Sequence, residues 1–248
     1  MAMIKVSGKT VYKAIARGPI LVMDKQEVVI TEETVADVEA EVARVKDAIE
    51  TAKAQKANLI ITHHPVIFHG IKNVRADSVV YQVIRNDMHV ISAHTNLDKA
   101  EDGVNYQMAE RLGLIDVAPV GDCGVIGYLS APMDSRFFLD RVKEVFRCQC
   151  LMHNQVLERP VQSVVICGGS GEFLLDEAIA QEADAFLTGE MRYHFYMGHE
   201  QEIQICVMGH YESEQYTIEL LEKILAERFQ HLPLYKTEIN TNPIQYLL

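Results

Sequence analysis

Short apolar segments alternate along the chain with longer segments in which apolar residues recur every three or four positions. Buried-strand patterns occupy residues 26–31, 58–62, 89–93, 163–167, 185–188 and 203–208. Helical patterns occupy residues 32–55, 78–87, 104–114, 135–146, 171–183 and 213–229. Strands that alternate with helices in this way predict an α/β fold with mostly parallel strands.

The pattern changes at residues 117–130, VAPVGDCGVIGYLS, where glycine and turn residues are frequent. We interpret this stretch as a lobe boundary or linker. The sequence therefore predicts two α/β lobes. The first comprises residues 1–120 together with about 207–248, and the smaller second lobe comprises residues 121–206.

Composition and charge narrow the class of protein. The chain is 48% apolar and 23% charged, as in ordinary soluble proteins, and no apolar run approaches the length of a membrane span. A net charge of −12 argues against general nucleic-acid binding, which needs a basic surface. The first residues lack the apolar core of a signal peptide, and the five cysteines show no zinc-site spacing. We therefore expect a cytoplasmic protein with reduced thiols.

Polar side chains follow three of the predicted strands at the point where each strand ends. They are a histidine pair, a histidine with an aspartate, and a histidine with a glutamate: His63 and His64, His94 and Asp98, and His210 and Glu214. Ligands of open parallel sheets bind beyond the carboxyl ends of the strands, so these side chains are candidates for one site. His210 and Glu214 are four residues apart and share one face of a helix.

Imidazole nitrogens combined with carboxylate oxygens suit zinc, manganese, iron or nickel, whereas calcium and magnesium prefer oxygen ligands. Neighbouring residues of a regular strand point to opposite sides, so His63 and His64 can hardly chelate one ion from a strand. Just beyond a strand end they could serve two neighbouring ions, which is an arrangement used for hydrolysis. The doubled histidine therefore suggests a dinuclear metal site.

Simpler interpretations stay open for each cluster taken alone. A histidine or aspartate after a strand is usually a cap or turn residue, and a histidine four residues from a glutamate is usually a solvated ion pair. Their joint occurrence at three strand ends favours a metal. Glu190 and His194 follow the strand at 185–188 and are candidates for proton transfer, or they belong to an ordinary polar loop.

The motifs ITHHPVIF, SAHTNLDKAEDGVNYQMAERLGL, VVICGGSG, ADAFLTGEMRYH and GHYESE closely resemble those of the Nif-three-like family, the GTP cyclohydrolase type 2 homologues. The resemblance runs from about residue 58 to the C-terminus. It implies a two-lobed α/β subunit with a dinuclear metal site between the lobes, and a toroidal homohexamer. Residue by residue, it implies the metal ligands His63, His64, Asp98, His210 and Glu214.

The first 55 residues differ from the family pattern, which usually has a tryptophan-containing acidic segment there, whereas this chain has no tryptophan. They are similar instead to the opening of enzyme I of the sugar phosphotransferase system. The phosphorylated histidine of that enzyme has no counterpart in this segment, so the similarity implies no phosphotransfer.

The leading hypothesis is a metal-dependent hydrolase that acts on a small phosphorylated or nucleotide-like substrate through two divalent transition-metal ions per subunit. Opening of GTP is one substrate assignment that the resemblance implies, with Glu190 or His194 moving protons. Two alternatives share the same ligand set: a metal-binding or metal-handling scaffold without turnover, and a regulatory interaction protein whose metal is structural. A coordination position open to water would favour the enzyme.

Overall fold

The computed structural model describes residues 48–68, 70–238 and 240–247, together with three short strands at residues 4–6, 9–11 and 28–31. The chain divides into two compact units. The first unit is Met1–Leu97 with Thr217–Gln245, and the second unit is Asp98–Tyr216 with Tyr246–Leu248. Both boundaries predicted from the sequence, near residues 120 and 207, lie inside the second unit.

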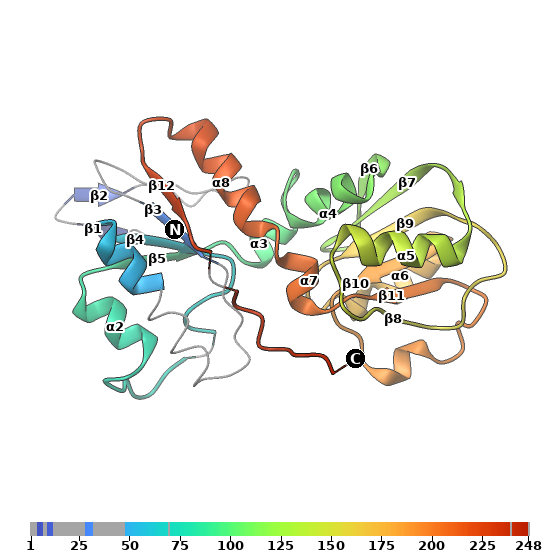
Figure 1. Ribbon diagram of the computed structural model, residues 1–248, viewed down its shortest axis with the longest axis horizontal. Coiled ribbons are helices and arrows are strands. Elements are labelled where there is room, and N and C mark those ends of the chain that lie inside the picture. Colours follow the sequence, from blue (N-terminus) through green and yellow to red (C-terminus); the bar gives the residue numbers. More distant parts are fainter. Residues whose placement is uncertain are drawn as a thin grey trace. The chain divides into compact units, whose positions relative to one another are not determined.

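The first unit is built on a four-stranded sheet with the order β12-β3-β4-β5. Its strands are β12 (Leu234–Lys236), β3 (Val28–Thr31), β4 (Leu59–Thr62) and β5 (His89–Ser92). Each neighbouring pair is parallel, as the sequence predicts. The helices α2 (Val79–Arg85) and α8 (Thr217–Arg228) lie on opposite faces of this sheet (Figure 1). A separate hairpin pairs β1 (Ile4–Val6) with β2 (Lys9–Val11).

The sheet is held by a small apolar core. All four residues of β4 are buried, and Ile60 packs with Ile49, Val79 and Met88. Ile49 lies in the helical residues 48–54, which are the end of the helix predicted at 32–55. The rest of that predicted helix lies outside the described residues.

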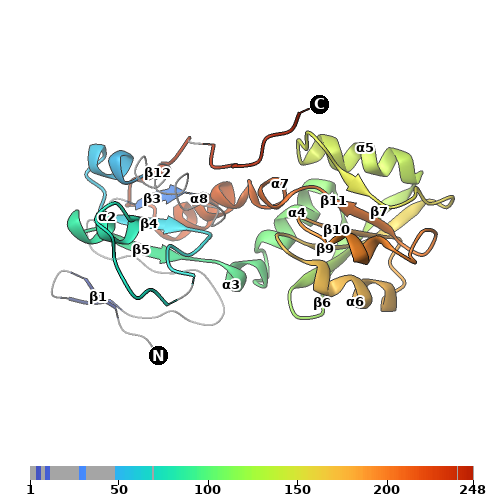
Figure 2. The same ribbon diagram turned by 90° about the horizontal axis from the view of Figure 1, so that it is seen from below.

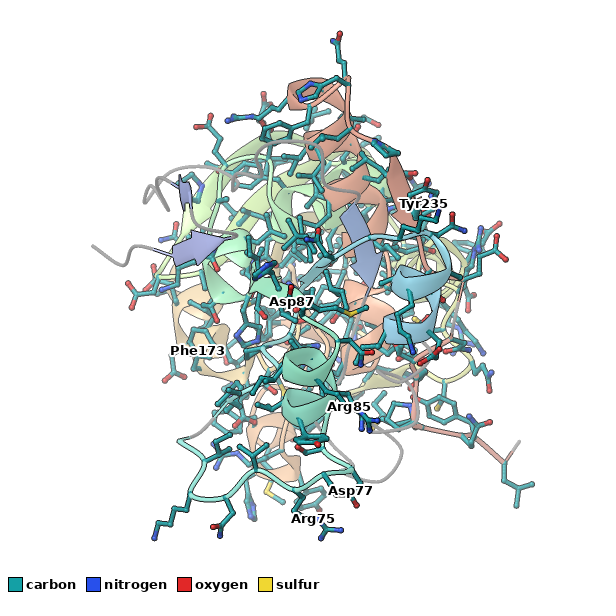
Figure 3. All side chains as sticks on the ribbon, turned by 90° about the vertical axis from the view of Figure 1, so that its left-hand side faces the viewer. Arg75, Asp77, Arg85, Asp87, Phe173 and Tyr235 are labelled. Carbon is teal, nitrogen blue, oxygen red and sulfur yellow. The ribbon has the colours of Figure 1, made fainter. Side chains whose placement is uncertain are left out.

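The loop before α2 shows how that helix begins. Ser78 is the N-cap, and its side-chain oxygen accepts a hydrogen bond from the Tyr81 amide. Figure 3 shows Arg75 and Asp77 in this loop, where they form an exposed ion pair of 2.8 Å. An exposed pair of this kind contributes little stability, so we assign the start of α2 to the cap.

The second unit is built on a six-stranded sheet with the order β6-β7-β9-β10-β11-β8. Its strands are β6 (Ile115–Val120), β7 (Gly124–Met133), β8 (Met152–His153), β9 (Val161–Cys167), β10 (Ala185–Thr188) and β11 (Gln204–Val207). The central strands β9, β10 and β11 are parallel, whereas β6, β7 and β8 join antiparallel. Mostly parallel strands therefore describe the first sheet, and the second sheet is mixed.

Helices cover both faces of this second sheet. They are α4 (Val104–Leu112), α5 (Ser135–Val145), α6 (Leu175–Ala180) and α7 (His210–Glu214), with the 3₁₀ helices η1 (Glu172–Leu174) and η2 (Tyr193–Tyr196). Figure 2 shows α5 and α6 on opposite faces. Because β10 is buried on both faces, it carries the continuous apolar pattern that made it recognisable in the sequence.

Two expectations from the sequence are wrong in detail. Residues 117–130 are not a linker, because they belong to the antiparallel hairpin β6–β7, with Gly121 (φ 53°) in its turn. The helix predicted at 213–229 is broken, because α7 ends at Glu214 and α8 begins at Thr217. The side chains at the break bind the end of α5: Gln215 donates to the Phe146 carbonyl and Tyr216 to the Val145 carbonyl. Within the described residues, no helix is both long and apolar enough to cross a bilayer.

Candidate metal site

His63 and His64 follow β4 at its carboxyl end. The Nδ1 atom of His63 lies 2.8 Å from the Ala93 carbonyl oxygen. A carbonyl can only accept, so Nδ1 carries a proton. In the neutral ring this leaves the lone pair on Nε2, which is the tautomer that a metal ion needs there.

A hydrogen-bonded turn presents His64. The Thr62 hydroxyl donates to the His64 carbonyl oxygen at 2.7 Å and lies 2.8 Å from the Ser92 hydroxyl. The apolar strand thus ends in a pair of hydroxyls that tie β4 to β5. Because His63 and His64 lie in this turn and not in the strand, their side chains need not point to opposite faces of the sheet.

His94 completes a group of three imidazoles in the first unit. Its ring centroid lies 5.4 Å from that of His63 and 5.2 Å from that of His64. The ring centroids of His63 and His64 are 4.9 Å apart. The sequence placed His94 at the next strand end among the candidates for the site, but the five ligands that the resemblance implies do not include it. Parallel pairing of β4 and β5 brings the three rings together, because both strands end at the same edge.

Asp98 ends the short helix α3 (Thr95–Asp98) and is half-buried. Its backbone is held by Asn105, a fully buried residue of α4 whose Nδ2 donates to the Asp98 carbonyl at 3.1 Å. The same amide group donates to the Cys123 carbonyl at 2.6 Å, and its oxygen accepts from the Gly168 amide at 2.7 Å. One side chain therefore fixes Asp98 to the turn after β9.

His210 and Glu214 lie on α7, one turn apart as the sequence predicted. The His210 Nε2 atom is 3.3 Å from Glu214 Oε2, and its Nδ1 atom is 3.0 Å from Glu190 Oε1. The Ser170 hydroxyl donates to the other oxygen of Glu190. The imidazole thus lies between two carboxylates, one of which is held from the opposite side by a serine.

This arrangement changes the pKa values of both partners. Burial would lower the pKa of His210, but hydrogen bonds to Glu190 and Glu214 outweigh it and raise the pKa to about 10. The hydrogen bond from His210 lowers the pKa of Glu190 against the effect of burial. Because Glu190 and Glu214 stabilise the protonated, positively charged form of His210, their surroundings favour a bound cation.

Glycines allow the loops of the second unit to approach α7 closely. A Cβ atom on Gly169, which has φ of 59°, would lie 2.5 Å from Glu214 Oε1. A Cβ atom on Gly189 would lie 2.7 Å from the Ser213 hydroxyl. That hydroxyl accepts from the Gly169 amide at 2.9 Å and donates to the His210 carbonyl at 2.7 Å. The glycine turn after β9 therefore supports α7.

The two residues considered for proton transfer lie in different surroundings. Glu190 belongs to the His210 group described above. His194 lies on η2 and is exposed, with its ring 5.7 Å from that of Tyr193. No signal in the sequence paired Glu190 with His210, since twenty residues and a strand separate them.

His63 and His64 of the first unit and Glu214 of the second are buried, and each offers a ligand atom of a type that binds metal ions. The chemistry of the donors fits such an ion: the backbone fixes the metal-binding tautomer of His63, and the carboxylates around His210 favour positive charge. Nitrogen and carboxylate donors together suit a divalent transition metal.

Known proteins are similar to this chain over most of its length. A family profile described as Duf34/NIF3 (NGG1p interacting factor 3) matches residues 28–243. A GTP cyclohydrolase 1 type 2 homolog of Clostridium acetobutylicum is 28% identical over 218 residues, 81% of each chain. A protein of the same name from Campylobacter jejuni is 30% identical over 200 residues, 78% of each chain.

Solved structures show the same fold. The Staphylococcus aureus hypothetical protein SA1388 superposes with a TM-score of 0.78 at 22% identity, covering 92% of this chain and 90% of that one. A Bacillus cereus protein related to NIF3 superposes with a TM-score of 0.74 at 20% identity, covering 90% and 89%. The profile begins before the motifs at residue 58, so the likeness includes β3.

Proposed function

Because the chain belongs to the Duf34/NIF3 family, we propose that it binds two divalent transition-metal ions per subunit and hydrolyses a small phosphorylated or nucleotide-like molecule. The ions would be zinc, iron, manganese or nickel. The observation that supports this most directly is the buried set of His63, His64 and Glu214, whose atoms are of the type that holds such ions.

The proposed ligands come from both units. They are His63, His64, Asp98, His210 and Glu214. Five mixed donors exceed the four of one tetrahedral ion, so we propose that they serve two ions with the Glu214 carboxylate as the bridge. The ions would polarise the substrate and lower the pKa of an attacking water.

The chain's own side chains have separate tasks in this proposal. The Ala93 carbonyl keeps the proton on His63 Nδ1, so that Nε2 faces the ligand position. Glu190 does the same for His210 by accepting from its Nδ1. Both Glu190 and His194 stay candidates for proton transfer. The engagement of Glu190 with His210 and Ser170 favours His194 for moving a proton and Glu190 for orienting the ligand.

The charge of the chain limits the substrate. With a net charge of −12, the protein repels polyanions at long range, whereas a pair of bound cations gives local attraction for one small anion. A phosphorylated metabolite or nucleotide fits this better than a nucleic acid. GTP is one member of this class, following the name of the relatives. We also propose a homohexamer, as the family resemblance implies.

A second candidate is a metal-binding scaffold, metal-handling or regulatory interaction protein without turnover. The family description favours it, because "NGG1p interacting factor" names an interaction and not a reaction. The same ligands would then hold metals with a closed coordination shell.

Metal analysis of the purified protein, followed by a hydrolysis panel that includes GTP, tests the proposal. We expect about two transition-metal ions per subunit and product release that stops on chelation and returns with metal. His64→Ala should lose metal and turnover, whereas His231→Ala, at an exposed histidine, should keep both. Two bound ions without turnover on any phosphorylated substrate would favour the scaffold. No bound metal would contradict both.

A further inference from the structure

Two of the five cysteines lie together where β7 begins and β9 ends. These strands pair antiparallel with Val125 opposite Ile166, which brings Cys123, just before β7, next to Cys167, the last residue of β9. Cys123 packs against the apolar cluster that contains Cys167. The two thiols are also near enough to shift each other's pKa values. The pair is therefore a contact between side chains that are 44 positions apart.

The two thiols differ in exposure and in the direction of their pKa shifts. Cys123 is half-buried, while Cys167 is buried. The hydrogen bond from Cys167 lowers the pKa of Cys123, with help from Lys99 and against burial and Asp98. The same hydrogen bond raises the pKa of Cys167, together with burial. One thiol is thus reachable and inclined to ionise, and its neighbour is a protected donor.

We propose that Cys123 and Cys167 are a thiol redox site that closes to a reversible disulfide under peroxide. The Cys123 thiolate attacks the O–O bond of the peroxide, which gives a sulfenic acid and releases hydroxide. The Cys167 sulfur then attacks the Cys123 sulfur, and the S–S bond forms as water leaves. Overall, two thiols are oxidised and one hydrogen peroxide is reduced to two waters. A small dithiol reverses the step by exchange.

Hydrogen bonds of Asn105 connect the backbone around the two cysteines to the backbone of Asp98. Asn105 donates to the Cys123 carbonyl at 2.6 Å and accepts from Gly168, the residue after Cys167, at 2.7 Å. The same Asn105 amide group donates to the Asp98 carbonyl at 3.1 Å. A disulfide adds a covalent tie across this bridge, so the backbone that carries Asp98 must adjust. If the proposed metal-binding function holds, the disulfide weakens metal binding.

Cys148 and Cys206 are poorer nucleophiles. Burial raises the pKa of Cys148 to about 12, and it also raises the pKa of the fully buried Cys206. Cys150 is half-buried, like Cys123, and therefore offers a control matched for exposure. Two residues before it lies Cys148, whose thiol is largely protonated at neutral pH.

Thiol counting and peptide mapping of the full chain test the redox site. After brief exposure to hydrogen peroxide, the five titratable thiols of the unfolded protein should fall to three. Mass spectrometry without reductant should find the peptides of Cys123 and Cys167 linked, with a loss of two hydrogens. Dithiothreitol should restore five thiols. Cys123→Ser should abolish the linked peptide, and Cys150→Ser should leave it unchanged.

Several results would overturn the redox site. They are a count that stays at five, a link that uses Cys148 or Cys150, or a Cys123 that proceeds to sulfinic acid while Cys167 stays reduced. Because Cys167 is buried and Cys167→Ser carries a risk to folding, Cys123→Ser is the deciding variant.

The link to metal binding has its own measurement. Calorimetry measures the dissociation constant for zinc of the reduced and of the peroxide-treated protein. We expect the peroxide-treated protein to bind zinc at least several-fold more weakly, and we expect no such difference in Cys123→Ser. Equal affinities would contradict the coupling. A chain that binds no zinc in either state would contradict the proposed function, and the thiol count would still decide the redox site.

Discussion

Each ring nitrogen of His210 faces a carboxylate, and this makes the residue the most pH-sensitive part of the described site. Its pKa of about 10 lies above the value of about 6.5 expected for an unfolded histidine. A group whose folded pKa is raised stabilises the fold fully below the unfolded pKa. The stabilisation is lost as the pH rises through the folded pKa.

We therefore expect the metal-free protein to lose stability between pH 6.5 and 10, and we expect Glu190→Gln to flatten this dependence. The substitution removes one of the two carboxylates that hold the proton on His210. Urea unfolding across this range measures the slope, and NMR titration of the His210 ring measures the pKa directly. Glu158→Gln, at an exposed glutamate, should leave both unchanged. A slope that survives in Glu190→Gln would refute the role of that carboxylate.

Gly169 provides a steric test of the support for Glu214. Gly169→Ala should cost about 1–3 kcal/mol, because it adds backbone strain at a positive φ and a Cβ that would lie 2.5 Å from the Glu214 carboxylate. Gly198→Ala is the matched control, since its φ of 87° is also positive but no atom lies within 4 Å of its Cβ. Chemical unfolding and metal content measure the difference. Equal losses in both variants would assign the whole effect to strain.

Much of the site was predictable residue by residue, because strand ends, ligand chemistry and helical spacing are local signals. His63, His64 and the His210–Glu214 pair lie where the pattern predicted them. The partners that fix them were not predictable. The Ala93 carbonyl that sets the His63 tautomer is thirty residues away, and only the pairing of β4 with β5 brings it there.

At the scale of elements, buried strands and amphipathic helices were predictable from periodicity, whereas their ends and partners were not. The glycines of 117–130 suggested a linker, yet a hairpin turn also needs glycine, and only the partner strand distinguishes the two. The break between α7 and α8 was hidden, because Gln215 and Tyr216 fit a helix and leave it only to bind α5.

Asn105 links three elements, so its loss tests whether α4 holds the site together. Asn105→Ala removes the partners of the Gly168 amide and of the Cys123 and Asp98 carbonyls. We expect a loss of about 2–3 kcal/mol in the free energy of unfolding, together with weaker metal binding. Asn73→Ala, in an exposed loop, should change neither. A variant of Asn105 with wild-type stability would show that water replaces these hydrogen bonds.

At the scale of the whole molecule, the proposed ligands divide between the two units, with His63 and His64 in the first and Asp98, His210 and Glu214 in the second. An ion that binds only the folded state stabilises it by about 2.7 kcal/mol when the concentration of free ion is a hundred times its dissociation constant. The sequence predicted a first lobe made of two separate stretches, and the first unit is made of two, Met1–Leu97 and Thr217–Gln245.

The proposed bridging role of Glu214 gives a stoichiometric prediction. Glu214→Gln should lower the occupancy of both ions together, from about two per subunit, and should reduce the metal-dependent rise in melting temperature. Elemental analysis and thermal unfolding measure the two effects. Glu144→Gln, at an exposed glutamate of α5, should keep both ions. Loss of one ion alone, or of none, would remove the bridging assignment.

Proton competition offers the most complete test, because it joins ligands of both units in one measurement. Imidazole ligands must lose their protons to bind, and His210 holds its proton up to a pKa of about 10. Zinc affinity should therefore fall from pH 7 to 5 and should rise above pH 7, by up to tenfold per pH unit for each proton displaced.

His64→Ala has one imidazole fewer, so its affinity should be lower throughout and should change less steeply with acid, whereas His231→Ala should follow the wild type. Hydrolysis, where present, should decline over the same acid range and return when zinc is restored at neutral pH. If His63, His64 and His210 only cap strand and helix ends, no such coupling exists. Identical metal retention in the wild type and His64→Ala across pH 5 to 9 would then reject the dinuclear site.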